Sequence, residues 1–191
     1  MISKLSLWHK PILAAALVTS FVAYSAIVPS NAQATGYTCY NGGMPSKIIG
    51  LQYSAVNSTW QDGFTTARGR WNSAGVGASI TIYGGSPSYM TAGNYTNYSW
   101  YGLYTPYSAL FGGVGSFGIK VNATTLNRNA PSGKYWTWVL STSTHELGHA
   151  LRLPDNPATA TPNIALMNQN RDRSTVGFPT SYDKANVKAC F

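Results

Sequence analysis

The sequence predicts an α+β fold, because helical and extended periodicities alternate along its 191 residues. Apolar residues recur at helical spacing between Ser58 and Ser73, as they do on one face of an amphipathic helix. Apolar and polar residues alternate from Ala78 to Tyr83, and this period of two is typical of a strand. A second helical stripe covers residues 136–151. No internal repeat or interdomain linker is visible, so we expect one domain.

The limits of the first predicted helix are marked by polar residues and a glycine. Its apolar face consists of Trp60, Phe64, Ala67 and Trp71. Asn57 or Ser58 can cap its start, and Gly75 can end it. The two tryptophans in the stripe are explained by core packing.

Two strands are predicted in the middle of the chain. The first, from Ala78 to Tyr83, ends at Gly84 and Gly85, and the second covers residues 118–123. The region between them is rich in Tyr, Gly and Ser, and we expect it to hold shorter strands and a long loop.

The segment from Trp136 to Leu151 predicts a helix that is buried on most sides, because both of its faces are largely uncharged. One face carries His145 and His149 together with Trp138 and Thr142, so this face is expected to line a site. The helix should end by about Arg152, because the residue before Pro154 avoids helical geometry. A final helix is expected over residues 179–187.

The first 34 residues have the pattern of a secretory signal peptide. Lys4 and Lys10 give a positive start, residues 11–28 are almost wholly apolar, and Ala32-Gln33-Ala34 offers a cleavage site. A membrane anchor is the alternative, but the cleavage site favours removal. We therefore expect a secreted, extracellular domain of residues 35–191 with no membrane segment after cleavage.

The mature domain is basic and has two cysteines. Without Lys4 and Lys10, eleven basic residues face five acidic ones, a net charge of +6. This excess favours anionic partners such as cell-wall polymers, whereas no motif supports binding of nucleic acid. In an exported protein Cys39 and Cys190 are expected to form a disulfide, worth about 4–5 kcal/mol on the chain-entropy model. Two unpaired thiols are the alternative. We expect a monomer.

The chemistry of the chain is concentrated in His145-Glu146-Leu147-Gly148-His149. Histidines four apart on a helix project side by side, so both imidazoles can bind one zinc ion at about 2.0–2.1 Å. Glu146 can then act on a water on that ion as general base and pass the proton to the leaving amine. A chance match on a helix surface is the alternative, since this motif alone has false positives.

A catalytic zinc needs a third protein ligand. The mature chain has no other histidine, and Glu146 is the only glutamate in the sequence. The remaining carboxylates are those of Asp62, Asp155, Asp172 and Asp183. Asp155 is favoured, because a sharp turn before Pro154 can bring it back beneath the metal.

The segment from His145 to Asp155 resembles the extended zinc signature of metzincin proteases, and its final Asp is similar to snapalysins and to secreted bacterial matrixin-like enzymes. Ala165-Leu-Met167-Asn looks like the Met-turn of that group, and residues 179–184 resemble the start of its C-terminal helix. The resemblance implies a twisted mixed sheet with two helices above it and a small C-terminal subdomain with a helix. It also implies a zinc-dependent endopeptidase that cleaves peptides or proteins.

The chain departs from that pattern at two positions. Arg152 replaces the signature glycine, which normally turns with positive φ, and an Arg there costs on the order of 1 kcal/mol. We therefore expect an unusual backbone at Arg152, with its side chain in solvent, and a slight stabilisation from Arg152→Gly. Gln169 stands where some metzincins have a tyrosine that acts at the metal, so that role is not carried over.

The alternative to an enzyme is a non-catalytic secreted binding protein with a structural zinc or none. Its aromatic residues could stack on sugars: Tyr95, Tyr98, Trp100, Tyr101 and Tyr104. An open fourth position on zinc beside Glu146 would distinguish the enzyme from a binding protein, which needs neither. Sites for N-glycosylation are present at Asn57, Asn94, Asn97 and Asn122.

Overall fold

The computed structural model describes residues 38–110, 112–156 and 164–191. Internal contacts divide the chain into Met1–Gln33 and Ala34–Phe191, and all described residues belong to the second unit. The predicted signal peptide lies outside the described residues. The elements in chain order are β1 (Ile48–Tyr53), α1 (Ser58–Asn72), β2 (Ser79–Ile82), β3 (Tyr89–Gly93), β4 (Gly102–Ser108), β5 (Val114–Asn122), α2 (Ala123–Asn129), α3 (Tyr135–Ala150) and α4 (Ser181–Ala189).

The strands form one mixed sheet of five in the order β2-β1-β3-β5-β4. The first four in this order run parallel, and β4 is an edge strand that pairs antiparallel with β5. Gly112 and Gly113, both at positive φ, lie in the short β4–β5 connection, as an antiparallel pair allows. The α+β class and the mixed sheet are thus confirmed.

The helix α1 forms where the apolar stripe predicted it. The side chain of Asn57 caps the helix by accepting from the N–H of Trp60, and the chain leaves the helix at Ser73. Phe64 and Trp71 are fully buried, and the indole N–H of Trp71 donates to the carbonyl of Thr144 at 2.8 Å. This buried hydrogen bond joins α1 directly to α3.

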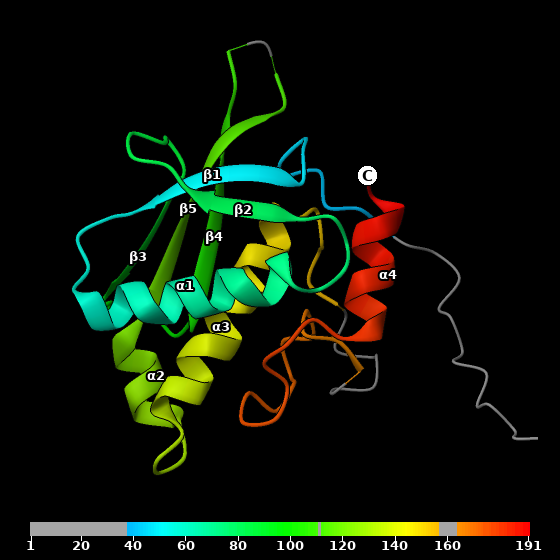
Figure 1. The fold of residues 1–191 in the computed structure, drawn as a ribbon. Coiled ribbons are helices and arrows are strands. Elements are labelled where there is room, and N and C mark those ends of the chain that lie inside the picture. The colour runs from blue at the N-terminus through cyan, green and yellow to red at the C-terminus, as the bar shows by residue number, and fades with distance from the viewer. Residues whose placement is uncertain (1–37, 111, 157–163) are drawn as a thin grey trace, which may run out of the picture. The chain divides into compact units, whose positions relative to one another are not determined.

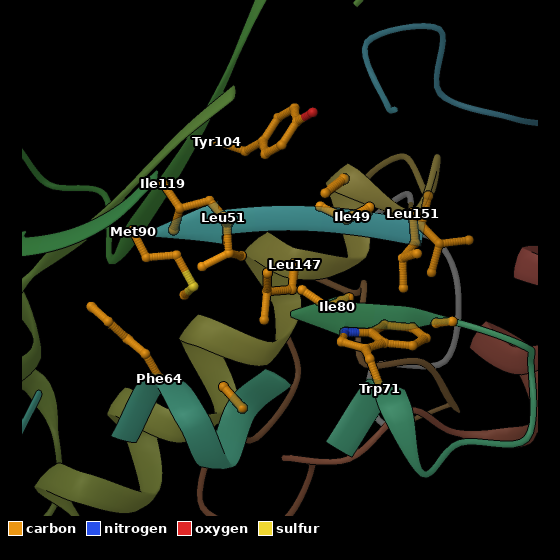
Figure 2. Packing of buried hydrophobic residues seen from close by; sticks show 14 of the residues in the cluster. Ile49, Leu51, Phe64, Trp71, Ile80, Met90, Tyr104, Ile119, Leu147 and Leu151 are labelled. Atoms are coloured by element: carbon orange, nitrogen blue, oxygen red, sulfur yellow. The ribbon is translucent and has the colours of Figure 1, made fainter. Parts of the chain in front are cut away.

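The core lies between the sheet and the helices α1 and α3, which lie on the same side of it (Figure 1). Figure 2 shows the side chains that meet there. The sheet contributes Ile49, Leu51, Ile80, Met90 and Ile119, and the helices contribute Phe64, Trp71 and Leu147. On the opposite side of β1 and β2, Ile48 and Ile82 are exposed. The helices thus cover one face of these two strands.

Three elements differ from the prediction, namely β1, β5 and α2, and the last of these was not predicted at all. The strand β1 was not predicted, although it lies inside the sheet. The second predicted strand is longer at its start and ends at Asn122, where α2 begins. The side chain of Asn122 caps this short helix by accepting from the N–H groups of Thr124 and Thr125. Ala123 is therefore helical, because the cap stops the strand.

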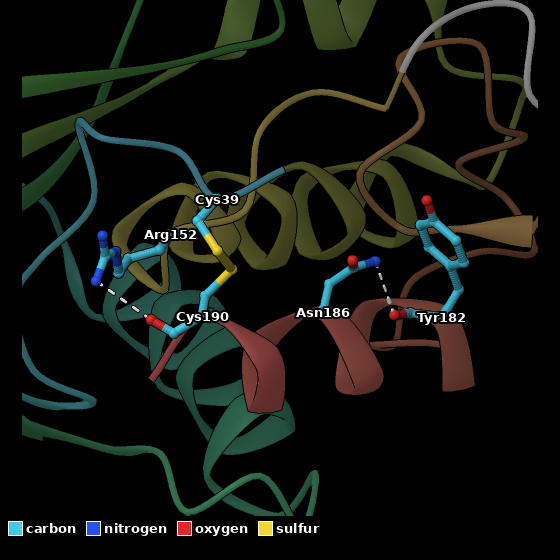
Figure 3. The surroundings of a disulfide bond; sticks show 5 residues. All are labelled: Cys39, Arg152, Tyr182, Asn186 and Cys190. Carbon is cyan, nitrogen blue, oxygen red and sulfur yellow. Dashed lines mark hydrogen bonds between the residues drawn. A yellow bond between two sulfur atoms is a disulfide. The ribbon is translucent and has the colours of Figure 1, made fainter. Parts of the chain in front are cut away.

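The C-terminal helix α4 begins with a capping box between Thr180 and Asp183 and leads to a disulfide. Cys190 is bonded to Cys39, with their Cα atoms 5.6 Å apart, which confirms the predicted pairing (Figure 3). Across the described ranges, helices are too short or too polar to traverse a bilayer.

Candidate metal centre

The helix α3 presents His145 and His149 on consecutive turns. Their ring centroids are 4.9 Å apart and the rings are nearly perpendicular. As predicted, this helix is buried on most sides, since residues 141–148 are all buried from solvent. The two imidazoles therefore lie at the base of a hollow rather than on a free surface.

Hydrogen bonds to backbone carbonyls fix the orientation of both imidazoles. His145 Nδ1 lies 2.9 Å from the carbonyl oxygen of Leu166, and His149 Nδ1 lies 2.8 Å from that of Leu153. A carbonyl can only accept, so each Nδ1 carries the hydrogen. In the neutral rings each Nε2 then has a free lone pair, the arrangement found behind metal-binding histidines.

Asp155 joins the two histidines through the turn that the sequence predicted. Its Oδ1 lies 3.1 Å from His145 Nε2 and 3.6 Å from His149 Nε2. Of the carboxylates considered as third ligand, this is the one that the structure places with the histidines. The turn passes through Arg152 at φ 64°, the left-handed conformation that the signature glycine would adopt.

The side chain of Arg152 does not extend into solvent as expected. Its Nη1 donates to the carbonyl of Cys190 at 3.2 Å (Figure 3), and its guanidinium lies 5.6 Å from the ring centroid of Phe191. The expectation was wrong because the disulfide brings the C-terminus beside this turn.

The three converging atoms have the charge and spacing that suit a divalent cation. Burial, followed by the charge of Arg171, lowers the pKa of His145 to about 3, and burial also lowers that of His149. Burial alone would raise the pKa of Asp155, but its contact with His145 and the charge that the two imidazoles carry when protonated bring it to about 2. At neutral pH two lone pairs and a carboxylate oxygen face one another.

These electron-rich atoms favour a cation between them. Ligand atoms of tetrahedral zinc are about 3.3 Å apart, given bonds of about 2.0–2.1 Å. The distances of 3.1 and 3.6 Å from Asp155 bracket that value. The residues present therefore fit zinc as a donor set of two imidazoles and one carboxylate.

Gln169 holds the other oxygen of the third candidate ligand. Its side-chain amide donates to Asp155 Oδ2 at 2.8 Å, which leaves Oδ1 directed at the histidines. No role was predicted for Gln169. Its function as an orienting residue depends on the segment after Met167 folding back over the turn after α3, and local spacing does not reveal that.

The carboxyl group of Glu146 is buried beside the three candidate ligands. Burial, followed by the charge of Asp155, raises its pKa to about 8, against the opposing effects of Arg171 and Arg173. It accepts a hydrogen bond from the backbone N–H of Tyr104 in β4. A Cβ at Gly102 would lie 2.7 Å from the Glu146 carboxyl carbon, so this strand can approach the carboxylate only because residue 102 is glycine.

Met167 lies against α3 between the turns that carry the histidines. A Cβ at Gly148 would collide with the Met167 sulfur, so the glycine inside the motif gives Met167 its place. Asp183 holds this segment, since its carboxylate accepts from the N–H groups of Leu166 at 2.8 Å and Met167 at 3.3 Å. Asp183 thus anchors the turn and is not near the histidines.

The other two candidate carboxylates lie elsewhere. Asp62 is exposed on α1, and Asp172 is exposed in a turn whose Ser174 N–H it accepts at 2.8 Å. Neither belongs to the cluster of His145, His149 and Asp155.

The cluster opens into a cavity of about 770 Å³, referred to below as the cleft. Its walls are the start of β4, the side of α3 that carries Thr142, His145, Glu146 and His149, and the segment from Gln169 to Arg173. Arg171 and Arg173 bring positive charge to this last wall, and the sequence did not predict either.

Arg171 is almost fully buried behind His145. Its Nη1 donates to the carbonyl of Asn168 at 3.0 Å and lies 3.1 Å from His145 Nδ1. Its Nε and Nη2 donate to the hydroxyl and carbonyl of Ser141. Burial, followed by the charge of Arg173, lowers the pKa of Arg171 to about 9.

Neither protein-family models nor curated protein sequences match this chain.

Proposed function

We propose that this chain is a secreted zinc-dependent endopeptidase of the metzincin type. The observation that carries the proposal is the convergence of His145 Nε2, His149 Nε2 and Asp155 Oδ1 beside the buried carboxyl of Glu146. Three protein ligands leave an open position on zinc, which distinguishes catalytic from structural sites. The left-handed Arg152 at the place of the signature glycine supports the family resemblance.

When bound, zinc would polarise the scissile carbonyl and lower the pKa of water. Glu146 is positioned to accept a proton from that attacking water and to transfer it to the leaving amine. Its raised pKa of about 8 in the metal-free protein indicates an environment in which the carboxylate is a strong base. The N–H of Tyr104 orients the carboxylate for both steps.

The edge strand β4 offers a place for an extended substrate. The carbonyl of Tyr101 accepts from the N–H of Asn122 in β5 at 2.8 Å. Because backbone groups alternate in direction along an antiparallel strand, Gly102, Tyr104 and Pro106 direct their backbone groups to the open edge. At this edge Glu146 already accepts from the N–H of Tyr104, so the other groups are the ones available to a peptide. Pro106 has no N–H to leave unpaired there. A peptide that adds as a further strand would pass along the cleft beside Glu146.

The disulfide favours an oxidising compartment and therefore an extracellular protein, as the leader sequence suggests. A net charge of +6 for residues 35–191 would suit anionic cell-wall polymers near the site of action. We expect the enzyme to act as a monomer on peptide or protein substrates.

The test is hydrolysis of casein by the purified, zinc-loaded mature protein. We expect hydrolysis that a chelator abolishes and zinc restores, and that Glu146→Ala abolishes without loss of zinc. Asp62→Ala is a matched control, because it removes an exposed carboxylate on α1 that belongs neither to the cluster nor to the walls of the cleft. Full hydrolysis by Glu146→Ala would remove the proposed mechanism.

The alternative is a sugar-binding protein, favoured by an aromatic cluster next to the cleft. Trp100 packs against Tyr95 and Tyr98, with centroid distances of 5.0 and 5.6 Å, and Tyr98 is largely exposed. Retention on a polysaccharide that persists with chelator, in a protein that hydrolyses no peptide, would favour this alternative.

A further inference from the structure

Arg173 brings a positive charge to the cleft close to the candidate general base. Its guanidinium lies 4.2 Å from the ring centroid of Tyr101 at the start of β4 and 5.7 Å from that of Trp138 on α3. Its Nη2 donates to the carbonyl of Gln169 at 3.2 Å. The side chain is thus held in place by rings from two walls of the cleft.

This charge forms no ion pair within the described part of the chain, although it acts on the nearby carboxyl group of Glu146. The ion-pair contacts found there join only Asp155 to the two histidines. Glu146 and Asp155 are the carboxylates that line the cleft. Glu146 accepts from the N–H of Tyr104, and Asp155 faces the two histidines. Asp172, the neighbour of Arg173 in sequence, is exposed and caps its own turn by accepting from Ser174 and Thr175.

Most hydrogen-bonding groups of Arg173 remain unused by the described residues. A guanidinium has five N–H donors, and the bond to Gln169 accounts for one of them. Thr142, on the α3 wall of the same cleft, has a hydroxyl for which the described residues also offer no partner. A half-buried cation with unused N–H groups, in a cleft whose wall also contains a buried and unpaired hydroxyl, is suited to a ligand that brings negative charge.

We infer that Arg173 makes the cleft selective for peptides with an acidic side chain next to the scissile bond. This inference rests on the proposed endopeptidase function. A substrate carboxylate would form charge-assisted hydrogen bonds with the guanidinium, which is planar and can bind both oxygens. A lysine or arginine at the same substrate position would meet Arg173, and Arg171 behind it, and be rejected.

The experiment uses zinc-loaded mature protein and pairs of fluorogenic peptides. A pair differs only in Asp against Asn, or Glu against Gln, at one position beside the cleaved bond, which mass spectrometry locates. For the wild type we expect kcat/KM at least about tenfold higher for the acidic member at one of these positions.

The variants test whether Arg173 is the cause. Arg173→Gln should bring the ratio of kcat/KM for the acidic peptide to that for the amide peptide close to one. Arg173→Glu should make a lysine peptide the better substrate. Arg173→Lys should keep part of the preference. Arg128→Gln removes the same charge from exposed α2 and should leave the ratio at its wild-type value. Zinc content and circular dichroism identify any variant that fails to fold.

Three outcomes contradict the inference in different ways. Hydrolysis by the wild type without acidic preference overturns the inference and leaves the endopeptidase intact. If Arg173→Gln lowers kcat/KM equally for acidic and amide substrates and shifts the acid limb of the pH profile, Arg173 acts through Glu146 and not on the substrate. Absence of hydrolysis of any peptide overturns the proposed function itself.

Discussion

At Arg152 the effect of backbone strain on the free energy of unfolding can be measured separately from the effect of the side-chain contacts. It sits at φ 64°, where a side chain is strained relative to glycine by about 1–2 kcal/mol. Its guanidinium also binds the carbonyl of Cys190 at 3.2 Å and lies against Phe191. Arg152→Ala keeps the strain and loses these contacts, whereas Arg152→Gly loses both.

The expected magnitudes follow from these contacts. The hydrogen bond is worth about 1 kcal/mol and the exposed ring contact about 0.5–1 kcal/mol, so Arg152→Ala should lower the free energy of unfolding by about 1–2 kcal/mol. Glycine relieves the strain but gains freedom in the unfolded chain, a cost of about 0.4–1 kcal/mol. Arg152→Gly should therefore be about 1 kcal/mol more stable than Arg152→Ala. It should not exceed the wild type, contrary to the stabilisation expected from the sequence.

The assay is urea unfolding of the metal-free variants, with Tm as a second measure. A difference of about 1 kcal/mol corresponds to about 2–4 °C in a domain of this size. Arg128→Ala, on exposed α2, controls for loss of an arginine elsewhere. An Arg152→Gly protein no more stable than Arg152→Ala would refute the strained turn and with it the route that brings Asp155 to the histidines.

Three further predictions concern the metal, the buried glutamate and the disulfide. The protein should bind about one zinc per chain, and Asp155→Ala should weaken binding sharply in a competition titration; unchanged affinity would exclude Asp155 as a ligand. In the metal-free protein, Glu146→Gln should be stabilising at pH 8 and nearly neutral at pH 4. Folding raises the pKa of Glu146 from 4.5 to about 8. The buried carboxyl therefore lowers the free energy of unfolding as pH rises through that interval, by about 5 kcal/mol at most. Equal effects of Glu146→Gln at both pH values would contradict this. Replacing Cys39 and Cys190 by serine should lower stability by up to about 5 kcal/mol, because their loop spans 151 residues, and peptide mapping of the secreted protein that found both thiols free would contradict the pairing.

The elements and site residues predicted correctly are those encoded by local spacing. The helices α1 and α3 follow from apolar stripes, and the pairing of His145 and His149 follows from one helical turn. The helix α2 was missed because seven residues are too few to show a period, and β1 because Ile48-Ile-Gly-Leu-Gln-Tyr53 has no clean alternation.

Positions in the site that depend on distant segments were not predictable in the same way. Asp155 was reached by elimination and from the break at Pro154, because few carboxylates exist in the chain. Arg173, Gln169 and the N–H of Tyr104 are brought to the cleft by a loop and an edge strand that meet α3 only in the folded domain. The types of these residues do not indicate that the loop and the edge strand contact α3.

A glycine is not required at residue 152, because the surrounding segments hold the turn in place. The turn at Arg152 is held by both ends of the domain: the N–H of Tyr40 donates to the carbonyl of Arg152 at 2.7 Å, and that of Met44 to the carbonyl of Ala150 at 2.9 Å. A Cβ at Gly43 would lie 2.6 Å from the Arg152 Cα, so this N-terminal segment packs directly on the turn, and the disulfide of Cys39 ties it to the C-terminus. A glycine lowers the backbone strain of such a turn, whereas contacts with neighbouring segments stabilise the turn despite the strain. Here the contacts around the turn outweigh a strain of about 1–2 kcal/mol, and the geometry of the third ligand then depends on the closure of the whole domain rather than on one residue.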